Sequence, residues 1–188
     1  MASNNSFKPN LLRSTKAMAE KACHGFGSTT QVGLTQALGP VRITSSAVVA
    51  RPANDLFALS QDYRRRLEWD TYLSEAFLVG QADSAAVGVE SYCKSRSGAV
   101  MVSTYISYSP PTHAAVEMVS GPRILRRFSG TWRFRQLGPA ASEVKFIYNF
   151  ELRPRLIAWA FQPLVGALYR RSMDRRLQAF KAWAENGA

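Results

Sequence analysis

The chain has 188 residues, of which 46% are hydrophobic, and carries a formal net charge of +11 with a pI near 10.2. This length supports one globular domain with a core of its own, and the ordinary hydrophobic content excludes an intrinsically disordered chain. The sequence has no apolar run near the ~20 residues of a membrane-spanning helix and no apolar N-terminal segment of the secretory type, so we expect a cytoplasmic protein.

The first 38 residues differ in composition from the rest of the chain. They are rich in serine, asparagine, threonine, glycine and lysine and show only a weak helical pattern. Such a segment buries little apolar surface, so we predict a loosely ordered basic leader over 1–38 and one folded domain over 39–188. The absence of acidic residues before Glu20 is also typical of an organelle transit peptide, although the segment is poor in arginine.

The folded part begins with a strand and a helix. Alternating apolar residues over 41–50 predict the strand. Pro52 is placed to begin the helix, where its missing N–H costs nothing, and Leu56 and Phe57 start its apolar stripe. Residues 64–67 either end this helix or begin a second short one.

Six more segments between 72 and 152 alternate as strands do and are separated by glycine, proline and small polar residues. On the segment over 100–108, we expect the even-numbered residues, Thr104 among them, to share one face. The last segment has the clearest alternation, with one face formed by Val144, Phe146, Tyr148, Phe150 and Leu152.

A long amphipathic helix is predicted over 155–186. Apolar residues recur at steps of three and four from Val165 to Phe180, and Pro163 predicts a kink or a break inside the helix. Because the strands follow one another without intervening helices, the sequence predicts an α+β fold. In it, a curved antiparallel sheet of about seven strands wraps around the C-terminal helix.

Several residues, taken in order along the chain, carry a resemblance to a known superfamily. They are Pro52, Leu56, Phe57, Asp62, Trp69, Gly88, the turn at 108–111, Gly121, the run at 130–134, the run at 142–144 and Pro163. This pattern resembles the START-like or SRPBCC superfamily, and within it the polyketide cyclase/dehydrase branch. The resemblance implies a helix-grip fold with a ligand cavity between the sheet and the C-terminal helix.

The aromatic and β-branched residues on the inner face would line such a cavity, with a few polar handles. We expect it to bind a lipid, polyketide or quinone-like molecule, either as a carrier or sensor or as a cyclase or dehydratase. The alternative is a core that these same side chains fill completely. The candidate ligand-binding residues are Trp69, Thr104, Met118, Trp132, Phe134, Phe146, Tyr148, Val165, Leu168 and Tyr169.

The sequence contains no recognisable catalytic constellation. It has no nucleophile elbow, no phosphate-binding glycine loop and no metal-ligand cluster, so we predict no catalytic residue, no metal and no cofactor, and an enzymatic role stays open. Cys23 and Cys93 have no redox or metal-binding spacing, which indicates reduced structural thiols.

The positive charge suggests a second class of function. A basic surface favours RNA, the ribosome or an anionic membrane, although such charge is often only solvated. The arginines that would form this surface are Arg64, Arg65, Arg66, Arg170, Arg171, Arg175 and Arg176.

Overall fold

The computed structural model describes residues 40–153 and 155–187, with side chains described for 40–153 and 161–187. The leader predicted over 1–38 lies outside these residues. The described elements follow the predicted order. They are β1 (Val41–Val49), α1 (Ala53–Gln61), α2 (Arg66–Trp69), β2 (Leu73–Leu78), the 3₁₀ turn η1 (Val79–Gln81), β3 (Glu90–Ser95), β4 (Val100–Ser109), β5 (His113–Ser120), β6 (Leu125–Gly138), β7 (Ala141–Leu152) and α3 (Arg155–Glu185).

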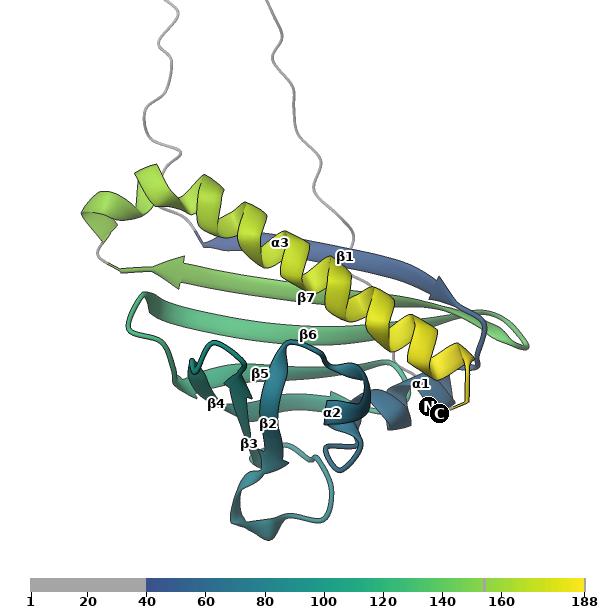
Figure 1. The fold of residues 1–188 in the computed structure, drawn as a ribbon. Helices are drawn as coiled ribbons and strands as arrows, with labels where there is room; N and C mark the ends of the chain where they lie inside the picture. Colours follow the sequence, from purple (N-terminus) through teal and green to yellow (C-terminus); the bar gives the residue numbers. More distant parts are fainter. Residues whose placement is uncertain (1–39, 154, 188) are drawn as a thin grey trace, which may run out of the picture. The chain divides into compact units, whose positions relative to one another are not determined.

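The strands form one antiparallel sheet of seven, in the order β1-β7-β6-β5-β4-β3-β2. The sheet curves, so that β2 and β3 lie far from β1, and α3 runs along β1 and β7 (Figure 1). This is the predicted α+β, helix-grip architecture. Pairing of β1 with β7 joins the first and last strands of the sequence, so the fold closes only after the whole sheet is present.

The long β6–β7 hairpin supplies most of the inner wall. Trp132 pairs with Phe146, and Gly130 pairs with Tyr148. A side chain at Gly130 would bring its Cβ within 3.3 Å of the Tyr148 ring, so glycine leaves room for that ring at the inner face. The alternation predicted for β7 is confirmed, because all five of its predicted inward residues are buried.

Helix α3 covers the sheet through an apolar stripe and several polar contacts. Met173, Leu177, Phe180 and Ala184 are completely buried. The Ser45 hydroxyl donates to Asp174, the Ala50 amide donates to Glu185, and the Lys181 ammonium donates to a backbone carbonyl of β1. The helix is continuous through Pro163, so of the predicted kink or break the break does not occur.

The short helices fill one end of the curved sheet. Helix α1 begins directly after Pro52, as predicted, and its first amide, that of Ala53, donates to Gln136 Oε1 at 2.7 Å. The residues predicted to end α1 or begin a new helix lead into the four-residue helix α2. Asp70 follows α2 and is completely buried.

Strand β4 differs from the prediction in the face that it turns inward. Ser103 and Tyr105 are buried, whereas Ile106 is half exposed and Thr104 lies on the outer face opposite Glu90. The register against β5 also shifts twice along β4, once after Val102 and once after Tyr105. Such a bulge changes which residues share a face, and residue parity alone does not reveal it.

Candidate functional site

A cavity of about 420 Å³ lies inside the curve of the sheet. Its walls come from β3 to β7, from the segment around α2, and from α3. This volume is within the range of small-molecule sites in proteins. A sheet that curves around a helix therefore leaves space here that the side chains do not occupy, in place of the filled core that was the alternative.

Aromatic rings pack against one another along the cavity wall. Trp132 stacks on Phe146 at 4.1 Å between ring centroids, and Tyr148 meets both Phe146 at 4.6 Å and Phe128 at 4.7 Å in edge-on contacts. These ring–ring contacts fix the orientation of the aromatic side chains, which form one apolar wall of the cavity.

Half of the residues predicted to bind a ligand line this cavity. They are Trp132, Phe146, Tyr148, Leu168 and Tyr169. Burial raises the pKa of Tyr169 to about 12, so its hydroxyl is protonated at neutral pH. Their contact with a ligand stays a prediction.

The other five predicted residues lie elsewhere. Thr104 is on the outer face of β4 for the reason given above, and Met118 and Val165 are half-buried outside the cavity lining. Phe134 packs edge-on against Phe57, and Trp69 packs against Phe180 at 4.9 Å. The Trp69 indole N–H finds no hydrogen-bond acceptor among the described residues.

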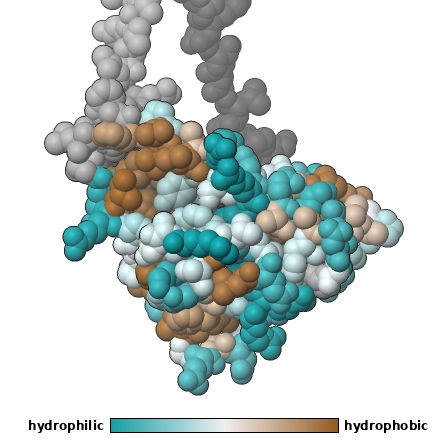
Figure 2. All heavy atoms as spheres, in the orientation of Figure 1, coloured by the Kyte–Doolittle hydropathy of each residue, from teal (hydrophilic) through white to brown (hydrophobic). Residues whose placement is uncertain are grey.

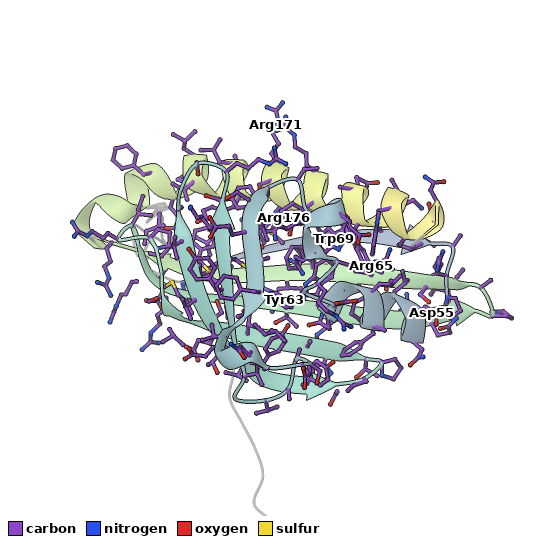
Figure 3. The ribbon with its side chains drawn as sticks, turned by 60° about the horizontal axis from the view of Figure 1, so that its bottom comes forward. Asp55, Tyr63, Arg65, Trp69, Arg171 and Arg176 are labelled. Carbon is purple, nitrogen blue, oxygen red and sulfur yellow. The ribbon has the colours of Figure 1, made fainter. Side chains whose placement is uncertain are left out.

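A buried ionic cluster forms part of the cavity wall. Arg176 binds Asp70 through two hydrogen bonds, Nε to Oδ1 at 3.0 Å and Nη2 to Oδ2 at 2.6 Å. Arg66 donates from Nε to Asp70 Oδ2 at 3.0 Å and from Nη1 to the carbonyl of Ser60 at 3.2 Å. Arg176 also donates from Nη1 to the Tyr148 hydroxyl. Both arginines line the cavity, and Arg176 and Trp69 lie between α3 and the strands in Figure 3.

The cluster is ionised at neutral pH. Burial alone would raise the pKa of Asp70, but the charges and hydrogen bonds of Arg176 and Arg66 outweigh it and lower the pKa. Burial likewise acts to lower the pKa of each guanidinium, and the neighbouring groups, Asp70 among them, hold both above the ordinary value. The cluster therefore contains two positive charges and one negative charge.

A second polar chain crosses the cavity wall without charge. The Tyr105 hydroxyl donates to Gln61 Oε1 at 2.8 Å, Gln61 Nε2 donates to Ser60 Oγ at 2.7 Å, and that hydroxyl donates to the carbonyl of Phe57. Burial raises the pKa of Tyr105, and it does the same for the neighbouring Tyr63. The tyrosines therefore add hydrogen-bonding groups to the cavity and no negative charge.

Three strand residues of the types that act as general bases, Glu90, Glu117 and His113, lie outside the cavity lining. Glu117 is exposed, Glu90 faces outward with Thr104, and His113 contacts Ser107 and Thr112. Cys93 lines the cavity, and burial raises its thiol pKa. Among the described residues, no group of three His, Cys, Asp or Glu side chains is arranged to hold a metal.

The proposed basic surface is smaller than predicted. Arg66 and Arg176 are buried in the cluster with Asp70, and Arg65 is paired with Glu68 at 2.9 Å. Exposed arginines of the set remain at Arg64, Arg170, Arg171 and Arg175, and Arg171 projects away from the sheet in Figure 3. The prediction that all seven arginines form a basic surface is therefore wrong, because Arg66 and Arg176 lie on the inward-facing sides of their helices, where Asp70 neutralises part of their charge.

The mouth of the cavity carries exposed apolar side chains. Leu168 of α3 is 60% exposed and Ile124, just before β6, is 48% exposed, and both line the cavity. Phe161 and Leu164 continue the exposed apolar surface along α3, where apolar residues gather in Figure 2. In the part of the chain that is described, no helix has the length and apolar character to span a bilayer.

Sequence reasoning missed Arg66 and Arg176 as cavity residues, yet both carry a local signal. Arg66 and Asp70 are four residues apart, the spacing at which side chains meet on a helix. Arg176 lies three residues after Met173 and four before Phe180, so it belongs to the buried stripe of α3. Ser103 and Tyr105 were missed because of the bulged register of β4.

Solved structures from several organisms have a similar fold, and the three described below are 11–15% identical to this chain. A START superfamily protein from Mycobacterium smegmatis is 11% identical, with a TM-score of 0.65, covering 78% of this chain and 98% of that one. The Zhui aromatase/cyclase from Streptomyces sp. R1128 is 15% identical, with a TM-score of 0.64, covering 78% and 94%.

A third similar structure is norcoclaurine synthase from Thalictrum flavum in complex with dopamine and hydroxybenzaldehyde. It is 14% identical, with a TM-score of 0.60, and the match covers 91% of this chain and 99% of that one. At these identities the likeness establishes the fold alone. Comparison with curated protein sequences gives no significant match.

The sequence itself places the chain in a family. The family model described as polyketide cyclase/dehydrase and lipid transport matches residues 40–185, which is nearly the whole of the described fold. The chain therefore belongs to the polyketide cyclase/dehydrase and lipid transport family.

Proposed function

We propose that the protein binds an apolar or aromatic small molecule in the cavity between the sheet and α3. The observation that carries this proposal is the 420 Å³ cavity with an aromatic layer on one wall and a few fixed polar groups. An apolar wall favours binding through burial, and fixed polar groups set the orientation of the ligand. Membership of a family that includes lipid transport supports the same ligand class.

The expected affinity is moderate unless the polar groups contribute. Burying about 200 Å² of apolar ligand surface provides roughly 5 kcal/mol, at about 25 cal/mol per Å². Association costs several kcal/mol of this in lost freedom. A ligand that also bonds to the polar wall would therefore bind much more tightly than a pure hydrocarbon.

Binding without turnover is the better supported form of this function. The polar part of the described cavity wall consists of tyrosines, serines, two arginines, one glutamine and one thiol, and the wall contains no carboxylate. The nearby carboxylate of Asp70 is fully occupied by the two guanidinium groups. Among the described hydrogen bonds, none joins a serine hydroxyl or the thiol of this wall to a histidine or carboxylate that could act as its base. A carrier or sensor releases the ligand unchanged, whereas a cyclase or dehydratase releases a product, and for a dehydratase its mass is also lower by one water.

Two neighbouring alanines of β5 provide a matched test. Ala114 is buried and lines the cavity, whereas Ala115 is on the opposite face of the same strand. Ala114→Phe should fill part of the cavity and abolish binding of N-phenyl-1-naphthylamine, an apolar fluorescent probe, while Ala115→Phe should bind it as the wild type does. Leu168→Trp at the mouth should weaken binding with less effect on the core.

The measurement is probe fluorescence by titration, with native mass spectrometry of the purified protein for a molecule that copurifies. Thermal unfolding shows whether each variant keeps its fold. Equal probe affinity in wild type, Ala114→Phe and Leu168→Trp would rule out binding in this cavity. Carrier and enzyme are then distinguished by the chromatographic retention and the mass of the copurified molecule before and after incubation, because cyclisation without loss of water changes the retention and leaves the mass unchanged.

A further inference from the structure

The cavity wall holds more positive than negative charge. Arg66 and Arg176 are 6% and 7% exposed, and Asp70, which is completely buried, is the carboxylate that both of them contact. The other ionisable groups nearby, Tyr63, Tyr148 and Cys93, have pKa values raised by burial and are neutral at pH 7. One positive charge is therefore left without a described counter-charge.

The two arginines differ in how fully their donors are used. Arg176 donates through all three of its nitrogens, to both oxygens of Asp70 and to Tyr148. Arg66 donates through Nε and Nη1, and its Nη2 donates to no described residue. A guanidinium has five N–H donors, so Arg66 is the member of the cluster with capacity to spare.

Aromatic contacts hold the Arg66 guanidinium in place. Its Cζ lies 4.3 Å from the Trp69 ring centroid, 5.8 Å from that of Tyr63 and 5.9 Å from that of Trp132. These distances are within the range of cation–π attraction. The group is therefore fixed before any ligand arrives, and little entropy is lost when it binds one.

We propose that the ligand of this cavity is an amphipathic anion whose single negatively charged oxygen group, such as a carboxylate, binds Arg66 while its apolar body lies on the aromatic wall. This inference rests on the proposed function and names its ligand class. An unpaired charge inside a protein is unfavourable, and a ligand anion offsets it in surroundings where charge-assisted hydrogen bonds are strong. A monoanion matches the single surplus charge.

The test uses two fluorescent probes that differ by one charged group. 1-Anilinonaphthalene-8-sulfonate is a monoanion, and N-phenyl-1-naphthylamine is the same ring system without the sulfonate. The wild type should bind the anion more tightly than the neutral probe. In Arg66→Met the affinity for the anion, relative to that for the neutral probe, should fall roughly 10–100-fold, the range expected for a hydrogen bond to a charged group.

Arg66→Met is expected to fold, because Asp70 keeps both hydrogen bonds to Arg176 and the cluster becomes neutral overall. Arg66→Lys, which keeps the charge, should keep part of the preference for the anion. Arg171→Met removes an exposed arginine of α3 that lies outside the cavity lining and should leave the ratio unchanged, so it separates the cavity from general attraction to basic charge. Circular dichroism checks each fold, and if Arg66→Met does not fold, the wild-type comparison decides.

Equal affinity for the two probes in the wild type, or an unchanged ratio in a folded Arg66→Met, would overturn the anion site. The proposed function would stand in that case, provided that Ala114→Phe still abolishes binding of the neutral probe. Binding of both probes that is indifferent to Ala114→Phe would place them outside the cavity and would overturn both proposals.

Discussion

Asp70 and Arg176 are 106 positions apart in the sequence and are joined by two hydrogen bonds, of 3.0 and 2.6 Å, inside the protein. The contact ties the end of α2 to the middle of α3. Arg66 shares the same carboxylate, so Asp70 connects α2, the arginines of the cavity wall and α3.

Asp70→Asn should destabilise the protein by about 3–5 kcal/mol, because it leaves two buried guanidinium groups without their counter-charge. Chemical denaturation at pH 7 measures the free energy of unfolding. Asp83→Asn, at an exposed loop position, is the control and should change stability by less than about 0.5 kcal/mol. Equal denaturation midpoints for the two variants would contradict a structural role for the cluster.

The stability that Asp70 contributes should be lost in acid. Its pKa is lowered in the folded protein, so its contribution is fully present above the pKa of the unfolded chain and disappears as the pH falls through the folded pKa. The difference in unfolding free energy between wild type and Asp70→Asn should stay constant from pH 7 to about pH 5 and shrink below about pH 4. A difference that grows on acidification would show that the sign of the pKa shift is wrong.

The fold was predictable because its signals are local and repeated. Alternation along β7 and the stripe from Met173 to Phe180 each identify an element, and their apolar faces fit only when the helix covers the sheet. The cavity was harder to predict, because its existence depends on how far the sheet curves. Thr104 shows the limit of parity: a bulge shifts the register of β4 and turns Ser103 and Tyr105 inward instead.

The ionic cluster was missed for a different reason. An arginine in a basic protein is expected on the surface, and only the partner makes its burial favourable. The partner of Arg176 is Asp70, which is remote in sequence, so no window of the sequence contains the pair. The position of Arg176 within the buried stripe of α3 was the available clue.

The packing of α3 on the sheet can be tested with two substitutions of the same kind. Phe180→Asp places an unpaired charge at a completely buried position and should cost about 3–5 kcal/mol or prevent folding. Gln178→Asp introduces the same group at an exposed position two residues earlier on the same helix and should cost much less. Thermal unfolding compares them, and an equal loss in melting temperature would contradict the assigned face of α3.

The Cys93 thiol offers a direct report of cavity occupancy. It lines the cavity on β3, and burial raises its pKa although Arg66 and Arg176 act in the opposite direction. A raised pKa means less thiolate at a given pH, and the thiolate is the form that reacts. In a Cys23→Ser background, Cys93 should therefore react with iodoacetamide at pH 8 several times more slowly than N-acetylcysteine, and bound N-phenyl-1-naphthylamine should slow it further.

The control places the thiol on the other side of the same sheet. Thr104→Cys, in a chain that also carries Cys23→Ser and Cys93→Ser, presents its sulfur on the outer face of β4. Its reaction should not depend on the probe, because the cavity and that thiol are separated by the sheet. Mass spectrometry follows both reactions over time. Cys93 that reacts as fast as N-acetylcysteine, or at a rate that the probe does not change, would contradict its place in a ligand-binding cavity.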